Sequence, residues 1–167
     1  MRSLARDAGH VPGNRGTALL LDDRLVLRVS RHWNDLAGYR LFPSRQQIDP
    51  WMMADDWANC ALIELQSPLE ESTLLAVGDK LLPEPGCELD GKPLCHCPCD
   101  ALLGIVTAHL SDLIETRAPL TVGGAALHLC APILYRGALL PLADDGSHID
   151  SVLVAANYRR VSSQPRI

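Results

Sequence analysis

The first regular hydrophobic pattern lies between residues 18 and 40. Apolar side chains recur there every three or four positions, which is the spacing of one face of an α-helix. Pro43 follows, and a proline ends a helix because it lacks the backbone donor. The pattern therefore predicts a helix over 18–40 followed by a bend. Its stripe consists of Leu21, Leu25, Val29, His32, Leu36 and Tyr39.

The next two patterns alternate with a period of two, as half-buried strands do. Residues 58–66 predict one strand, with Ala61, Ile63 and Leu65 on one face. The turn "SPLEES" and a second strand at 73–77 follow. Strands joined by so short a turn predict an antiparallel hairpin.

A helical pattern returns at 101–117, after a loop at 83–99 that is rich in Pro and Gly. Asp100 stands where an N-cap residue is expected. Leu102, Leu103, Val106, Leu110, Leu113 and Ile114 form its apolar face.

Three strand-like stretches close the chain, at 120–123, 125–135 and 151–160. The "VGG" at 122–124 predicts a hairpin turn between the first two, and the Asp-Gly pair within 143–150 predicts another turn. Neighbouring strands joined by turns, with helices before and between them, predict an α+β fold. We expect an antiparallel five-stranded sheet with covering helices and an extra N-terminal helix.

The bend after the first helix carries a distinctive sequence, "FPSRQQIDP". It resembles the Pro-Ser-Arg…Ile-Asp-Pro motif of a bacterial PAS-like family of single-domain proteins, common in alphaproteobacteria. The resemblance covers roughly 25–160. It departs from the family at the end of the second strand, which lacks an arginine, and in the cysteine-rich loop. The matching positions are Trp33, Pro43, Ser44, Arg45, Ile48, Asp49, Pro50, Gly91, Leu94, Pro141, Leu142, Asp145, Gly146, Ile149, Asp150, Tyr158 and Arg159.

This resemblance implies a PAS-like domain over 17–161. Residues 1–16 hold glycines, a proline and charges without apolar periodicity, so we expect a flexible N-terminal tail there and a short C-terminal tail at 162–167. The bend itself is expected to be a structural clamp that folds the first helix over the sheet, with an ion pair between Arg45 and Asp49. The clamp consists of Pro43, Ser44, Arg45, Asp49 and Pro50.

Composition narrows the classes of function. The 167 residues carry a formal net charge of −5 and aromatics make up only 4% of them. A mildly acidic chain without a basic stripe or stacking aromatics is a poor nucleic-acid binder. Its apolar runs are too short to span a membrane, and no secretory signal is evident. We therefore expect a cytoplasmic protein whose six cysteines are reduced.

The densest chemistry in the sequence is the Cys-His-Cys-Pro-Cys run. Thiolates and an imidazole suit zinc or an iron–sulfur cluster, and Cys-Pro also resembles short haem-regulatory sites. Thiol redox sensing is a further alternative, because Cys99 precedes a predicted helix N-terminus. Small, partly buried loop cysteines with no such role are the plainer interpretation. The candidate ligand set is Cys87, Cys95, His96, Cys97 and Cys99.

Other polar positions invite plainer interpretations. Cys60 and Cys130 fall within strand patterns and are expected in the core. His128 alternates with leucines and is expected to be solvated, while His32 beside the apolar stripe is expected to be a hydrogen-bonded core residue. No nucleophile elbow, P-loop or dinucleotide fingerprint occurs, so no enzymatic activity is expected.

The resemblance implies a sensory or regulatory module that binds a small molecule or a signalling protein. A homodimer through the amphipathic first helix is the other expected partner. The alternative is a metal-binding, haem-binding or redox-active regulatory protein built on the cysteine run, so the cofactor stays open between none, haem and zinc. The expected ligand pocket consists of Trp51, Met52, Trp57, Leu103 and Val106.

Overall fold

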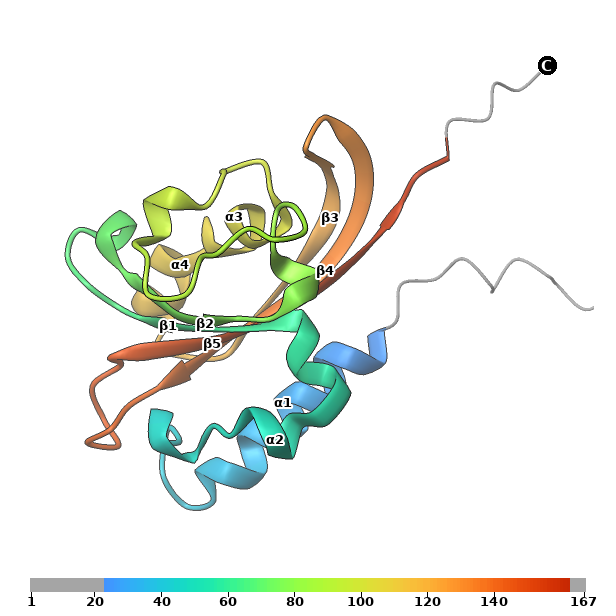
Figure 1. Ribbon diagram of the computed structural model, residues 1–167. Helices are drawn as coiled ribbons and strands as arrows, with labels where there is room; N and C mark the ends of the chain where they lie inside the picture. The colour runs from blue at the N-terminus through green and yellow to red at the C-terminus, as the bar shows by residue number, and fades with distance from the viewer. Residues whose placement is uncertain (1–22, 163–167) are drawn as a thin grey trace, which may run out of the picture.

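The computed structural model describes residues 23–162, so the expected tail at 1–16 and nearly all of the one at 162–167 lie outside the described residues. Five strands form one antiparallel sheet in the order β2-β1-β5-β4-β3 (Figure 1). This confirms the α+β prediction and is consistent with a PAS-like fold. The strands are β1 (Cys60–Glu64), β2 (Thr73–Val77), β3 (Leu120–His128), β4 (Ala131–Leu142) and β5 (Ser151–Arg160).

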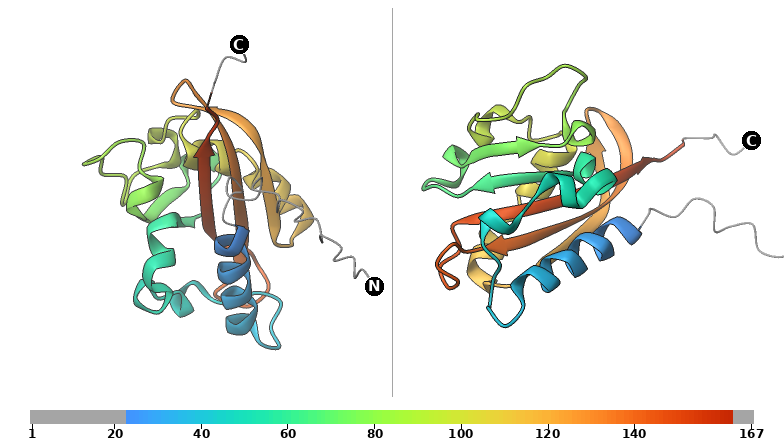
Figure 2. Two further views of the ribbon diagram at one scale, coloured as in Figure 1. Left: turned by 90° about the vertical axis from the view of Figure 1, so that its right-hand side faces the viewer. Right: turned by 60° about the horizontal axis from the view of Figure 1, so that its bottom comes forward.

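Helices cover both faces of this sheet, α1 and α2 one face, α3 and α4 the other (Figures 1 and 2). Short 3-10 segments, η2 to η6, connect them. The helices are α1 (Asp23–Ala37), α2 (Pro50–Met53), α3 (Leu102–Thr107) and α4 (Leu110–Thr116). The 3-10 segments are η2 (Arg45–Gln47), η3 (Ala54–Asn59), η4 (Leu69–Glu71), η5 (Asp79–Leu81) and η6 (Leu94–His96).

The two faces hold separate hydrophobic cores. The α3-side core joins α3 and α4 to the sheet through Leu103, Val106, Leu110, Leu113, Ile63, Leu139 and Val154. The α1-side core joins α1 and the bend to the sheet through Leu25, Val29, Trp33, Phe42, Leu140 and Leu153. Alternate residues of each central strand feed the two cores, which is why β1, β4 and β5 are apolar on both faces.

Helix α1 confirms the first predicted helix but ends at Ala37, three residues early. Gly38 follows with a φ of +56°, the left-handed conformation that commonly ends a helix. The Trp33 indole donates a hydrogen bond to the Pro141 carbonyl at 2.8 Å. Leu25, Val29 and Trp33 of α1 are buried against the sheet. The homodimer through this helix therefore gains no support from the structure and stays a prediction.

The hairpin of β1 and β2 confirms the prediction, with Ile63 opposite Leu74. The second predicted helix is instead two helices, because the chain turns at Ala108–His109. Its N-cap is Ala101 and not Asp100, and Ala101 makes no side-chain cap. Gly104 lets the cysteine loop touch α3, since a Cβ there would overlap the Pro98 carbonyl.

The predicted turn at 122–124 is wrong, and so is a strand over 125–135. These glycines lie inside β3, which pairs with β4 without interruption from Leu120 to His128. The turn is Leu129–Cys130, where both residues take a positive φ, +48° and +67°. Such a turn usually carries Asn or Gly, so the sequence gives no sign of it. Strand β5 and the turn at 143–150 agree with the prediction.

Candidate functional site

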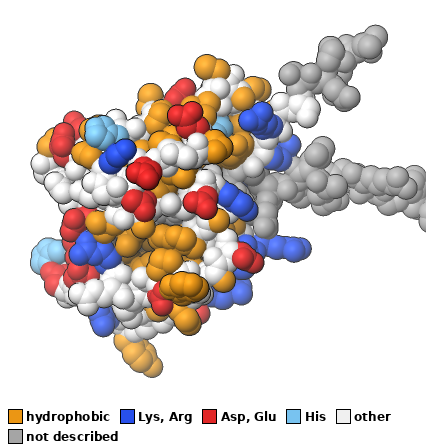
Figure 3. Space-filling model, in the orientation of Figure 1, with side chains coloured by type: hydrophobic (Ala, Val, Ile, Leu, Met, Phe, Trp, Pro, Cys, Tyr) orange, Lys and Arg blue, Asp and Glu red, His pale blue; other side chains and the backbone are white. Residues whose placement is uncertain are grey.

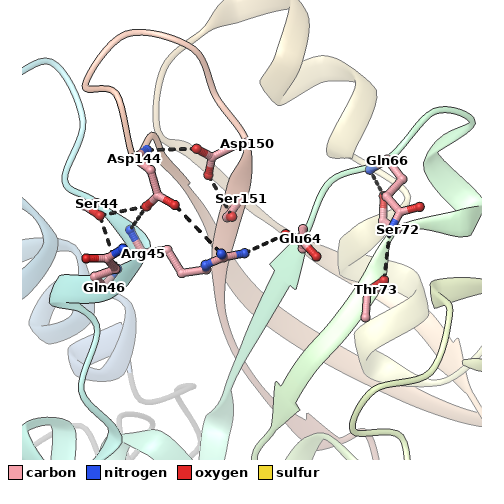
Figure 4. Close-up of polar contacts among 10 residues, drawn as sticks. All are labelled: Ser44, Arg45, Gln46, Glu64, Gln66, Ser72, Thr73, Asp144, Asp150 and Ser151. Atoms are coloured by element: carbon pink, nitrogen blue, oxygen red, sulfur yellow. Dashed lines mark hydrogen bonds and ion pairs between the residues drawn. The ribbon is translucent and has the colours of Figure 1, made fainter.

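The predicted clamp joins the bend after α1 to the sheet (Figure 4). The Ser44 hydroxyl caps η2 by accepting the Gln46 N–H, and the Ser44 N–H donates to the Gln47 side-chain oxygen at 2.8 Å. This reciprocal pair is a capping box, which holds the turn rigid at its start. Asp49 caps the next helix, α2, through the Trp51 N–H at 2.9 Å.

Arg45 is the centre of the clamp, but its partners differ from the predicted Asp49. Its guanidinium donates to the Glu64 carboxylate of β1 at 2.9 Å and lies 3.8 Å from Asp144. The hydrogen bond with Glu64 raises the pKa of Arg45, against the opposing effect of desolvation. Asp49 is unavailable because its carboxylate is used as a helix cap.

Asp144 extends the clamp to the β4–β5 turn. Its carboxylate accepts the Ser44 hydroxyl at 2.7 Å and the Arg45 backbone N–H at 3.1 Å. Asp150 in turn accepts the Asp144 N–H at 2.8 Å and the Ser151 hydroxyl at 2.8 Å. The clamp thus ties three separate segments together, and its acidic half was not predicted.

The five residues of the expected ligand pocket do not meet. Trp51 and Met52 are 91% and 74% exposed. Hydrophobic side chains gather over the α2 region in Figure 3. Trp57 packs against the α1-side core, whereas Leu103 and Val106 are fully buried in the α3-side core. The sheet separates the two groups, so no single pocket forms from them.

The cysteine loop does not form a metal centre. Within residues 23–162, no three His, Cys, Asp or Glu side chains are placed to hold a metal ion. Cys97 is buried, and desolvation raises the pKa of its thiol to about 11 even though a backbone hydrogen bond from Gly104 opposes this. With no metal bound, such a thiol is protonated at neutral pH. Cys95, His96 and Cys99 point to solvent, and Cys87 is half-buried.

The predictions for Cys60, Cys130 and His32 have different outcomes. Cys60 is buried as predicted, and burial raises the pKa of its thiol to about 12. Cys130 is exposed in the β3–β4 turn, so its placement in the core was wrong. The Nε2 atom of His32 is buried without a hydrogen-bond partner, so it is not the satisfied histidine expected.

His128, predicted to be solvated, is buried at the end of β3. Its Nδ1 accepts the backbone N–H of Leu102 at 3.0 Å and so caps α3 from a distant strand. A ring that accepts through Nδ1 is neutral and carries its proton on Nε2. Desolvation lowers the pKa of His128, as does the charge of Arg160, while the Asp100 carbonyl opposes the shift.

His128 lines a hollow of about 720 Å³ at the end of the sheet. Its ring lies 4.7 Å from that of Tyr158, tilted by 52°. The proline-rich segment after η5 contributes apolar lining, and charged residues of both signs also line the hollow. The lining includes Asp79, Lys80, Leu82, Pro83, Glu84, Leu129 and Arg160. We call this the His128 hollow.

A second hollow, of about 580 Å³, shares the side chains of Lys80 and Tyr158 with the first. It reaches α1, where Leu25 and Arg28 form part of its wall. Arg28 makes a two-point ion pair with Asp56 of η3, with the shorter contact at 2.7 Å. Tyr158 and Lys80 therefore stand between the His128 hollow and the start of α1.

One signal in the sequence points to the buried position of His128. In an uninterrupted strand over 120–128, the even positions Leu120, Val122 and Ala126 pack against the α3-side core. His128 has the same parity and must face inward with them. Because a turn was predicted at 122–124, this alternation was not followed as far as His128, and the histidine was not predicted to be buried.

Comparison with protein-family models and with curated protein sequences finds no match for this chain. Within residues 23–162, no helix combines the length and the apolar character needed to span a membrane.

Proposed function

We propose that this chain is a non-enzymatic, PAS-like sensory module of the cytoplasm that binds a small molecule in the His128 hollow. The observation that supports this most is His128 itself. It is buried where the hollow meets the sheet, and its Nδ1 accepts the Leu102 N–H, so the one N–H of the neutral ring is at Nε2. A few placed polar groups on an otherwise apolar wall are typical of small-molecule sites.

The lining favours a small planar molecule that carries a hydrogen-bond acceptor. Tyr158 and His128 offer ring surfaces, while Leu82 and Pro83 offer apolar contact. Aromatic rings pair favourably in offset or edge-to-face arrangements. The two cations of the lining are offset by its two carboxylates, so a strongly charged ligand is not favoured.

A ligand in the His128 hollow would affect the other face of the sheet through Tyr158 and Lys80. A ligand that moves either side chain changes the second hollow, whose wall includes Leu25 and Arg28 of α1. A signalling protein would then read the state of the α1 and α2 layer, where Trp51 and Met52 are exposed. A ligand shifts such an equilibrium only by its difference in affinity for the two states.

Native mass spectrometry of the full chain, purified from its expression host, tests the proposal. We expect a population that carries an added small-molecule mass, released on denaturation. His128→Gln keeps an acceptor for Leu102 but replaces the ring, and should lower this population several-fold. Tyr158→Leu should do the same without touching the helix cap.

His148→Gln is the matched control, because His148 is an exposed histidine in the β4–β5 turn. It should retain the added mass. If the wild-type chain carries no added mass and binds no neutral planar aromatic probe such as Nile red, the proposal fails. An added mass that survives in both His128→Gln and Tyr158→Leu places the ligand elsewhere and also contradicts it.

A further inference from the structure

The outer edge of β3 is bare among residues 23–162, whereas the outer edge of β2 is covered. Along β2, the Leu74 N–H donates to the Lys92 carbonyl at 2.9 Å, and Gly91 returns a bond to Leu74 at 2.6 Å. Strand β3 pairs with β4 on its inner side only. Proteins usually cover, shorten or charge an edge strand, because its unpaired backbone groups bind other strands.

The hairpin turn shows which groups of β3 face outward. A two-residue turn is flanked by a hydrogen-bonded pair, here His128 and Ala131, so the backbone groups of His128 point toward β4. Their direction alternates along the strand and the pairing has no bulge. The outward-facing residues are therefore Thr121, Gly123, Ala125 and Leu127.

The same four residues are exposed on the α1-side face of the sheet. The α1-side core contains no residue of β3, so α1 does not reach this strand. Leu127, 63% exposed, is the largest apolar side chain there. Backbone donors, backbone acceptors and apolar side chains are thus available on one uncovered strip, Leu120–His128, which we call the β3 strip.

A second copy of the chain is the occupant that charge favours. The net charge of −5 opposes the approach of two copies over most of their surface. The β3 strip contains no Asp, Glu, Lys or Arg, and its one histidine is held neutral. The strip itself therefore adds no charge repulsion between two copies, and Arg136 of the neighbouring β4, whose side chain lies beside Gly123, is a cation at its border. An antiparallel strand pair is also its own two-fold partner, as a closed dimer requires.

We propose that two copies pair antiparallel through their β3 strips and form one continuous sheet. Centring the two-fold axis on Gly124 places Thr121 opposite the second copy's Leu127 and Gly123 opposite its Ala125. All four outward-facing residues then pair, giving about eight backbone hydrogen bonds, two for each pair. With the two-fold axis at Gly124, the His128 hollow of each copy lies at one end of the paired strips. The proposed interface therefore does not depend on the proposed function.

Light scattering after size exclusion, with reductant present because Cys130 is exposed, measures the mass in solution. We expect a dimer for the wild-type chain at tens of micromolar. Leu127→Lys places a charge on each side of the interface and should weaken dimerisation at least about tenfold. Ala125→Pro removes one outward N–H, which an edge strand tolerates, and should weaken it too.

Leu27→Lys is the control, since Leu27 is 61% exposed on α1. It should remain a dimer, and thermal unfolding should show all three variants to be folded. Hydrogen exchange at Gly123 and Ala125 should be slow in the wild type and fast in Leu127→Lys. A wild-type monomer, or a dimer broken by Leu27→Lys alone, overturns the proposal. Slow exchange in a monomer also overturns it, because the chain itself would then cover the strip.

Discussion

The two faces of the sheet are closed by different means. On the α3 side, helices α3 and α4 bury hydrocarbon, and Leu103, Val106 and Leu113 are wholly inaccessible to solvent. On the α1 side, one apolar helix is supplemented by polar ties, from Trp33 to Pro141 and from Arg45 to Glu64. Apolar burial supplies most of the stability, whereas polar ties fix position at a small net gain. The position of the α1 layer therefore depends more on polar contacts than that of the α3 and α4 layer does.

The largest change in the free energy of unfolding should come from the α3-side core. Leu103→Ala removes a fully buried side chain of α3 and leaves a cavity, so we expect a loss of about 2–5 kcal/mol in the free energy of unfolding. Urea denaturation measures it. Leu27→Ala, at an exposed position of α1, should change that free energy by less than about 0.5 kcal/mol. Equal effects would remove the distinction between core and surface.

The indole tie on the α1 side should matter less. Trp33→Phe keeps the ring in the core but leaves the Pro141 carbonyl without its donor, at a cost of about 1–3 kcal/mol. The same denaturation series measures the loss. A cost as large as that of Leu103→Ala would mean that the polar tie, not the hydrocarbon, dominates this face.

The clamp should contribute still less to the free energy of unfolding. Arg45 is part-exposed, so Arg45→Gln should cost about 1 kcal/mol or less, because water screens and replaces its ion pairs. A double-mutant cycle with Glu64→Gln isolates the pair. The loss of the Arg45 contacts should show instead in hydrogen exchange, with α1 amides exchanging faster in Arg45→Gln. Unchanged α1 exchange would contradict a positioning role for the clamp.

The smallest expected effect is the pH dependence that His128 gives to stability. Its pKa is lowered in the folded protein, so the unfolded chain binds the proton more readily. The contribution is complete above the ordinary histidine pKa of about 6.5 and is lost as pH falls below it. The difference in unfolding free energy between wild type and His128→Gln should therefore shrink from about pH 7.5 to about pH 5.5. A difference that grows at low pH would contradict this sign.

Much of the fold follows from the hydrophobic pattern, because period and turn residues are local properties. Helix α1, the β1–β2 hairpin and β5 were all predictable in this way. The β3–β4 turn was not, since Leu129 and Cys130 adopt left-handed conformations that the surrounding pairing imposes on them. Tertiary context overrode local preference at that point.

The site was less predictable than the fold. The motif led to Ser44 and Arg45, but the partners of Arg45 are about 20 and 100 residues away along the chain, beyond any local pattern. The cysteines attracted attention by their chemistry and spacing. Within residues 23–162, however, no three His, Cys, Asp or Glu side chains are placed to hold a metal ion. His128 attracted no attention in the sequence, because its role depends on a hydrogen bond that caps another element, α3, at Leu102.

Hydrogen exchange of the protein as purified, compared with the same protein stripped by unfolding and refolding, tests the central claim most directly. The claim is that occupancy of the His128 hollow is passed to the α1 layer while the α3-side core stays fixed. It predicts slower exchange with ligand bound at the start of α1 and in η3, and equal exchange in α4. Changes confined to the walls of the His128 hollow, or none at all, would contradict it.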